Sequence, residues 1–185
     1  DVSAYGVFGT NKGIIMNLAV NGDISARRGG AVGGICGSNC GTIYGCSFEG
    51  TVYCNINGAV GGIAGTIDNG KILNCYTVAN VRAENYFAGG ICGSFSGTHS
   101  EINTCYFAGT VSSTDADNVG AIVGEKSASG ISCYDCYYDN ELCNVDNGHG
   151  KGVTTEQLCE LSGFSGDYRD ESIWTKGSYE VQSDG

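Results

Sequence analysis

The chain has 185 residues and carries 20 Asp and Glu against 9 Lys and Arg, which gives a net charge of -11. A chain this acidic repels the phosphates of nucleic acids and the headgroups of anionic lipids, so neither is expected as a partner. The longest apolar run, at residues 14–16, is far shorter than the roughly 18–20 residues of a membrane span, so direct membrane insertion is not expected either.

A seven-residue stretch recurs along the chain at a nearly constant spacing. It reads Ala-Val-Gly-Gly-Ile-Cys-Gly at 31–37, with close copies at 59–65 and 87–93 and weaker ones at 3–9 and 118–124. The last glycines, at positions 9, 37, 65, 93 and 124, lie 28, 28, 28 and 31 residues apart. A period in this range is typical of a solenoid. We therefore predict one repeat domain and, because the chain begins at Asp1, expect it to be a piece of a longer protein.

Three apolar columns fall into register with this stretch. The first contains Leu18, Cys46, Cys75, Cys105 and Cys136 and follows an Ile column by three residues. The second, two residues later, contains Val20, Phe48, Thr77, Phe107 and Tyr138, and the third, four residues later again, contains Ile24, Val52, Val81, Val111 and Leu142. A step of two residues keeps side chains on one face of a strand. Because the four-residue step holds a small residue such as Gly50, we expect a bend there and about three short strands in each unit.

This pattern predicts an all-β fold, a parallel β-solenoid of about five coils with 28–31 residues in each. The coils are expected near residues 3–30, 31–58, 59–86, 87–117 and 118–147, so that the solenoid occupies residues 1–147. Equivalent side chains of successive coils then stack into ladders in the core, each burial contributing about 1.5–3 kcal/mol. The predicted inward ladders are an aliphatic one, Val7, Ile35, Ile63, Ile91 and Ile122, and a cysteine one, Cys46, Cys75, Cys105 and Cys136.

Residues 148–185 leave the repeat and are predicted to form a C-terminal cap and tail. Thr154 and Gln157 have the spacing of a capping box ahead of Leu158, which predicts one short helix. The Ile-Trp pair at 173–174 is expected to return to the body of the protein. A solenoid end exposes unpaired strand backbone and a cross-section of its core, and such a cap covers both.

The repeat resembles the GLUG motif, on the residues Gly-Gly-Ile-Cys-Gly-Ser-Asn at 33–39, Gly-Thr-Ile at 41–43, Cys46 and Gly-Thr-Val at 50–52. The Val-Thr-Thr-Glu-Gln-Leu at 153–158 resembles it too. Such repeats occur in large secreted or surface-attached bacterial proteins, including adhesin-like proteins and non-catalytic parts of some immunoglobulin A peptidases. The resemblance implies a right-handed parallel β-helix in an extracellular location, acting as a structural or adhesive module. A surface protein or a glycan of the host or of bacteria is then the expected partner, and the motif carries no catalytic residues and no cofactor.

The eleven cysteines are interpreted mainly as packed, free thiols. In a ladder the cysteine side chains run parallel, which disfavours the crossed geometry of a disulfide even where the Cα atoms are close enough. The Cys-x-x-Cys pair Cys133 and Cys136 falls on ladder columns, so core packing is favoured over a redox or zinc site. If a disulfide forms, the sequence favours Cys133–Cys143 or Cys143–Cys159.

No catalytic or metal site can be assembled from the sequence. The two histidines, His99 and His149, lie in separate loops and accompany no repeated Ser or Asp. Asp135, Asp139 and Glu141 are candidates for a carboxylate pair that cleaves glycosidic bonds, but we do not expect an enzyme. The acidic loops at 115–118 and 139–147 match neither the EF-hand spacing nor the nonapeptide calcium solenoid, so solvated loops are favoured over a calcium site and no metal is expected.

An outward column of tyrosines is the candidate binding surface. Tyr76, Tyr106 and Tyr137 each follow an inward Cys and therefore point outward, where they could stack with sugars or dock a protein, or simply stabilise their neighbours. Two other functions stay open beside the structural and adhesive one. They are a carbohydrate-active or polysaccharide-binding β-helix, and a filament subunit that self-associates end to end.

Overall fold

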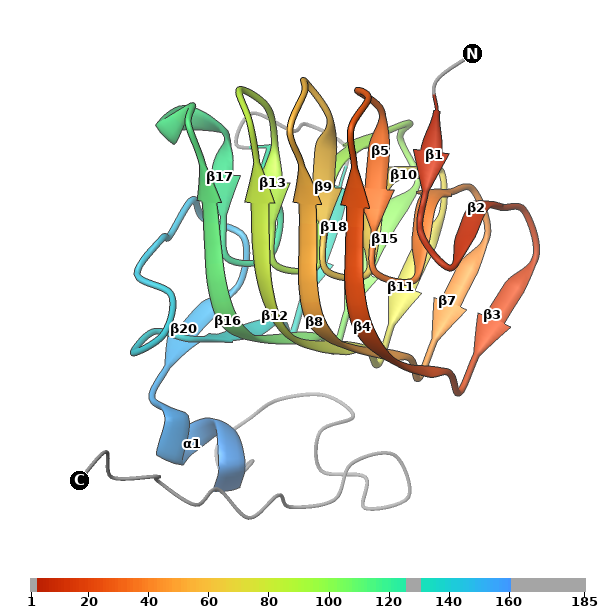
Figure 1. Ribbon diagram of the computed structural model, residues 1–185. Helices are drawn as coiled ribbons and strands as arrows, with labels where there is room; N and C mark the ends of the chain where they lie inside the picture. The colour runs from red at the N-terminus through yellow and green to blue at the C-terminus, as the bar shows by residue number, and fades with distance from the viewer. Residues whose placement is uncertain (1–2, 126–130, 161–185) are drawn as a thin grey trace.

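A computed structural model describes residues 3–125 and 131–160, and these form a β-solenoid of about five coils (Figure 1). This confirms the predicted fold class. Equivalent strands of successive coils pair in parallel and make four sheets, which we call A to D in the order in which the chain enters them. Sheet A contains β1 (Ala4–Tyr5), β5 (Ala31–Gly33), β9 (Ala59–Gly61), β13 (Ala88–Gly89) and β17 (Val119–Gly120). Sheet B contains β2 (Phe8–Asn11), β6 (Cys36–Asn39), β10 (Ala64–Asp68) and β14 (Cys92–Ser96).

The other two sheets complete each coil. Sheet C contains β3 (Ile14–Met16), β7 (Thr42–Tyr44), β11 (Lys71–Leu73), β15 (Ser100–Asn103) and β18 (Ile131–Tyr134). Sheet D contains β4 (Ala19–Ala26), β8 (Ser47–Cys54), β12 (Tyr76–Ala83), β16 (Tyr106–Ser113), β19 (Tyr137–Asp139) and β20 (Lys151–Val153). A 3-10 turn, η1 (Ala116–Asn118), precedes β17, and the helix α1 (Thr155–Glu160) follows β20.

Each of the first four coils therefore has four short strands, not the three that we expected. The predicted bend in the Gly-Gly-Ile segment is present and separates β5 from β6 at Gly34 and Ile35. The expected bend at the small residue of sheet D is wrong. In β12 inward and outward residues alternate without interruption, and Ala79 faces the core between Thr77 and Val81. A four-residue step is two periods of a strand, so a small side chain such as Ala79 simply faces inward. Gly22 and Gly50, at the same position, do have positive φ, of 146° and 136°, but their strands continue through them.

The three-residue step before the cysteine column has a different cause. The residue just before each column member has a left-handed backbone, with φ of 54° at Asn17, 59° at Gly45, 53° at Asn74, 53° at Thr104 and 47° at Asp135. Asn and Gly tolerate this region better than other residues, and they occupy three of the five positions. This single left-handed residue turns the chain from sheet C into sheet D.

The aliphatic ladder is in the core, except at its first member. Ile35, Ile63, Ile91 and Ile122 have no exposed surface, whereas Val7 is 49% exposed. Val7 belongs to the first coil, which among the described residues has a neighbouring coil on one side only. A buried amide ladder supports the turn from sheet B to sheet C, because Asn11 Nδ2 donates to Asn39 Oδ1 at 2.8 Å and Asn39 Nδ2 donates to the Lys71 carbonyl at 3.0 Å.

The last coil departs from the repeat at its fourth strand. Leu142, which we expected in the core, is 48% exposed. The reason is a turn at Asp139, whose Oδ1 accepts from the backbone N–H of Glu141 and of Leu142 and whose carbonyl accepts from the N–H of Cys143. The turn places the Cys143 side chain in the core instead, where it is 3% exposed.

The C-terminal segment folds back onto this end. Strand β20, which lies in the region that we assigned to the cap, adds a sixth strand to sheet D beside β19. The predicted helix is confirmed, and so is its capping box: Gln157 N–H donates to Thr154 Oγ1 at 3.2 Å, and Thr154 N–H donates to Gln157 Oε1 at 3.0 Å. The Ile-Trp pair at 173–174 lies outside the described residues.

Candidate functional site

The cysteine column lies in the core as stacked free thiols. Cys46, Cys75, Cys105 and Cys136 are each at most 3% exposed, and all eleven cysteines of the chain are free. Each thiol of the column donates to the carbonyl two residues before it, at the left-handed bend. These contacts are Cys46 to Tyr44 at 3.3 Å, Cys75 to Leu73 at 3.2 Å, Cys105 to Asn103 at 3.3 Å and Cys136 to Tyr134 at 3.1 Å. The thiols therefore hold the corner between sheets C and D.

Neither disulfide that the sequence favoured is formed. Cys143 is buried in the main core, on the inner side of sheet D. Cys159 lies on α1, whose Leu158 packs against the outer side of the same sheet. Cys133 lies in sheet C, where its thiol is hydrogen-bonded to that of Cys136. Sheet D lies between Cys143 and Cys159, whereas Cys133 packs against the same core as Cys143 and both thiols stay free.

Burial of the thiols predicts that alkali destabilises the fold. Burial raises the pKa of Cys36 to about 11, against the ordinary value of about 9 in an unfolded chain. Below pH 9 both states hold the proton and the thiol contributes its full stability, whereas between pH 9 and 11 only the folded state holds it. The free energy of unfolding is therefore expected to fall with rising pH, by up to about 1.4 kcal/mol per pH unit for each such thiol. Urea unfolding at pH 8 to 11 measures this slope.

Cys36→Ala is the matched variant for that measurement. Ala64 occupies the equivalent position of the next coil, in register with Cys36, so the core accepts Ala there. The variant is expected to have a shallower loss of stability between pH 9 and 11 than the unchanged chain. If the free energy of unfolding fell equally steeply with pH in the two proteins, the raised pKa of Cys36 could not be the cause of the fall.

Two of the three candidate carboxylates, Asp139 and Glu141, serve the cap, and the third, Asp135, lies at the left-handed bend between sheets C and D. Asp139 is 1% exposed, and besides the two backbone groups of its turn it accepts from Thr155 Oγ1 at 2.6 Å. Glu141 Oε2 accepts from Thr155 N–H at 3.0 Å, a contact that lowers the pKa of the Glu141 carboxyl. These contacts tie the turn after β19 to the start of α1. Within residues 3–125 and 131–160, no group of three or more His, Cys, Asp and Glu side chains is arranged to hold a metal ion.

The outward tyrosines contact the C-terminal segment of the chain. The rings of Tyr76 and Tyr106 are stacked, with centroids 4.9 Å apart and planes 7° apart. Tyr137 is 5% exposed and forms a small second cluster with Val153 and Leu158, against which the other two tyrosines pack. The outward column thus provides the surface on which β20 and α1 rest, and little of Tyr137 is open to a ligand. A binding role for the three tyrosines stays a prediction.

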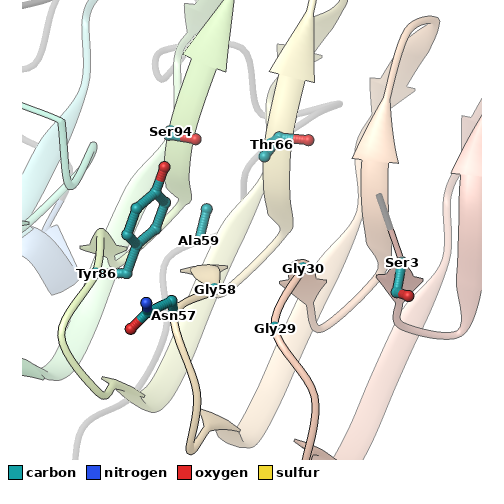
Figure 2. A pocket seen from close by; sticks show the side chains of 9 residues that line it. All are labelled: Ser3, Gly29, Gly30, Asn57, Gly58, Ala59, Thr66, Tyr86 and Ser94. Carbon is teal, nitrogen blue, oxygen red and sulfur yellow. The ribbon is translucent and has the colours of Figure 1, made fainter. Parts of the chain in front are cut away.

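A hollow of about 320 Å³ lies on another side of the solenoid and runs across four coils. Figure 2 shows its lining, which comes from the turns between sheets D and A and from the outer side of sheet B. We call it the groove, and it is lined by Ser3, Gly29, Gly30, Asn57, Gly58, Ala59, Thr66, Tyr86 and Ser94. Its size is within the range of small-molecule sites in proteins.

Two residues of the groove, Thr66 and Ser94, belong to a column of hydroxyl groups that continues beyond it along sheet B. Thr66 pairs in register with Ser94 on one side and with Ser38 on the other, and Ser38 pairs with Thr10. Successive hydroxyls are therefore about 4.8 Å apart, the spacing between paired strands. The sequence carried a signal for this column that we did not use: each of these residues directly follows the last glycine of the repeated stretch.

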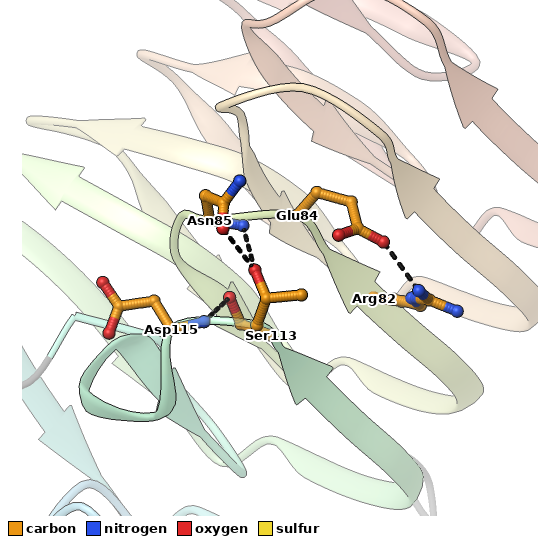
Figure 3. Close-up of polar contacts among 6 residues, drawn as sticks. Arg82, Glu84, Asn85, Ser113 and Asp115 are labelled. Atoms are coloured by element: carbon orange, nitrogen blue, oxygen red, sulfur yellow. Dashed lines mark hydrogen bonds and ion pairs between the residues drawn. The ribbon is translucent and has the colours of Figure 1, made fainter.

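The turn that carries Tyr86 is held by its neighbour in the next coil. Asn85, in the left-handed region at φ 57°, accepts from Thr114 Oγ1 at 2.6 Å and donates its N–H to the same oxygen at 2.8 Å (Figure 3). Ser113 Oγ donates to the carbonyl of Tyr86 at 2.7 Å. The Tyr86 ring meets the Phe87 ring edge-on, with centroids 4.6 Å apart, and stays 40% exposed. Tyr86 thus projects from a fixed turn into the groove (Figure 2).

One solved structure resembles this chain over most of its length. It is a crystal structure of a protein from Bacteroides ovatus described as a "putative immunoglobulin A1 protease", with a TM-score of 0.68 and 26% sequence identity. The match covers 86% of this chain and 58% of that chain. The two proteins share the solenoid fold. No protein-family model and no curated protein matches the chain, so the GLUG assignment stays a prediction.

Proposed function

We propose that the chain is a non-catalytic, adhesive and structural module of a larger extracellular bacterial protein. The observation that carries the proposal is the chemistry of the groove. Its polar side chains are hydroxyls, one amide and one phenol, which bind through hydrogen bonds and ring contact. Two of the three carboxylates that could have served catalysis, Asp139 and Glu141, are instead engaged in the turn after β19 and in the cap.

The first coil supports the part of the proposal that concerns a larger protein. Val7, Phe8, Ile14 and Met16 are between 42% and 69% exposed. Strands β1, β2, β3 and β4 of that coil each pair on one side only among the described residues. Such an edge is a template for further strands. We propose that this edge packs against a further coil of the same kind within the parent protein. Separately, no helix among the described residues is long and apolar enough to span a membrane.

Two assays on the purified chain test this function. The chain is expected to bind bacterial or host surface glycans on an array, and to leave both polysaccharides and immunoglobulin A1 uncleaved. The Bacteroides ovatus protein is described as a "putative immunoglobulin A1 protease", so that substrate is the relevant one for the catalytic alternative. Release of reducing sugar, or of immunoglobulin fragments, would overturn the proposal.

The end-to-end filament is the second candidate, and the exposed apolar side chains of the first coil favour it. Electron microscopy of the purified chain distinguishes a module of a larger protein from a filament subunit. Single short particles are expected for a module whose partner is a further coil of its parent protein, and long rods of stacked chains would indicate a filament subunit.

A further inference from the structure

We propose that the groove binds a neutral oligosaccharide chain, laid along the solenoid axis with one sugar ring stacked on Tyr86. The proposal rests on the adhesive function above and names the class of ligand and the place where it binds. Four observations carry it: an exposed aromatic ring, the rigid turn that presents it, an uncharged lining and the direction of the groove.

The aromatic ring offers an apolar face beside polar groups. Tyr86 is 40% exposed at the edge of the groove, and Ser94 and Thr66 lie on neighbouring strands of sheet B (Figure 2). A sugar ring has an apolar face of C–H groups and a rim of hydroxyls, so it meets both kinds of surface at once. Tyrosine supplies a large contact area and a hydroxyl in one side chain.

The turn is already ordered before a ligand arrives. The contacts of Asn85 with Thr114 (Figure 3) and of Ser113 with the Tyr86 carbonyl fix the backbone. The Phe87 ring supports that of Tyr86. Binding therefore loses little conformational entropy in the protein. Such pre-organisation raises affinity without further contacts.

The lining selects for a ligand without charge. None of the nine lining residues carries a charged side chain. The next position of the hydroxyl column, beyond Ser94, is Glu125, whose carboxylate accepts from Phe95 N–H at 3.4 Å. Together with the net charge of -11, this carboxylate repels acidic polysaccharides. Hydroxyl and amide groups both donate and accept, as the hydroxyls of a neutral sugar do.

The direction of the groove indicates a chain rather than a single sugar. Its lining runs from Ser3 in the first coil to Ser94 in the fourth, with Asn57 and Gly58 between them. Coils follow one another at about 4.8 Å, a spacing comparable to that between the rings of a linear oligosaccharide. An extended peptide is a poorer fit, because it binds by adding to a free strand edge, whereas β10 in the floor of the groove is already paired with β6 and β14.

Isothermal titration of the full chain with neutral linear oligosaccharides tests the proposal. The probes are di- to hexasaccharides of glucose, mannose and N-acetylglucosamine, with oligogalacturonate as the acidic counterpart. At least one neutral series is expected to bind, with affinity that rises up to about four sugar units and then levels off. Oligogalacturonate is expected to bind at least tenfold more weakly.

Three variants locate the site. Tyr86→Ala is expected to weaken binding at least tenfold, and Tyr86→Phe, which keeps the ring, by less than about threefold. Tyr134→Ala is the control, because Tyr134 is also an exposed tyrosine, at 56%, but does not line the groove. It is expected to bind as the unchanged chain does. Thermal unfolding of each variant, with an unchanged midpoint, shows that the fold is intact.

The contrary outcomes separate this inference from the function on which it rests. Binding of a neutral oligosaccharide that Tyr86→Ala does not weaken would overturn the groove as the site and leave the adhesive function standing. Failure of every neutral series, tighter binding of oligogalacturonate, or binding of a peptide through Tyr86 would overturn the ligand class. Cleavage of the bound oligosaccharide would overturn the adhesive function itself.

Discussion

Replacement of Ile63 by Asp is expected to abolish cooperative folding of the solenoid. Ile63 is the middle member of the aliphatic ladder, has no exposed surface and lies between Ile35 and Ile91 of the adjacent coils. Loss of its buried side chain costs about 2–5 kcal/mol. An unpaired carboxylate in the same place costs several kcal/mol more, and the total is comparable with the whole stability of a domain. Because each coil of a solenoid is stabilised mainly by its neighbours, a break in the middle separates the two halves.

Circular dichroism during thermal unfolding measures this effect, with Ile56→Asp as the control. Ile56 is also an isoleucine, but it lies in a turn between coils and is 49% exposed. Its replacement is expected to move the unfolding midpoint by only a few degrees. An Ile63→Asp variant that unfolds in one transition at the midpoint of the unchanged chain would contradict the placement of Ile63 in the core ladder.

The parts of the fold that the sequence predicts are those in which one residue type repeats in every coil. A side chain such as Ile63 is stacked between identical neighbours, so its column is visible in the spacing alone. The cysteine column is visible for the same reason, although its role at the corner is not. The thiol contacts with the carbonyl two residues earlier depend on a left-handed residue, and that residue is Asn, Gly, Thr or Asp in different coils. A backbone conformation that several residue types can adopt leaves only a weak trace in one sequence.

The end of the solenoid shows where repeat reasoning fails. Alignment placed Leu142 in an inward column, because it assumed that the fifth coil has a fourth strand like the others. A single buried carboxylate, Asp139, instead accepts two backbone hydrogen bonds and starts a turn. Such a turn is local chemistry that replaces a strand, and terminal repeats are atypical for this reason.

The candidate site was the least predictable part. Tyr86 lies in a spacer between coils and belongs to no column, and its exposure depends on bonds from residues 113 and 114 of the next coil. Contacts at a separation of about one coil cannot be read from the local pattern. The outward tyrosines, which do form a column, turned out to contact the C-terminal segment.

Replacement of Gly90 by Ala adds only one methyl group, but it is expected to lower the free energy of unfolding by at least about 1–3 kcal/mol. Gly90 precedes Ile91 in the bend between β13 and β14, and a Cβ atom there would collide with the carbonyl oxygen of Ala121 in the next coil and with the ring of Phe107. The backbone oxygen cannot move without disturbing the register of two coils, and the ring has no exposed surface and lies in a close-packed core. Glycine is therefore required at position 90 by the close approach of the backbone of the next coil and of the Phe107 ring.

Urea unfolding compares this variant with Gly13→Ala. A Cβ atom at Gly13 would meet no other atom within 4 Å, and Gly13 has no positive φ, so its replacement is expected to leave the free energy of unfolding within about 0.5 kcal/mol of that of the unchanged chain. The two variants add the same methyl group and remove the same backbone freedom from the unfolded state, so the difference between them isolates the contact in the bend. Equal stabilities would show that the bend has room for a side chain. The recurrence of glycine there would then need another cause than the Phe107 ring and the Ala121 carbonyl.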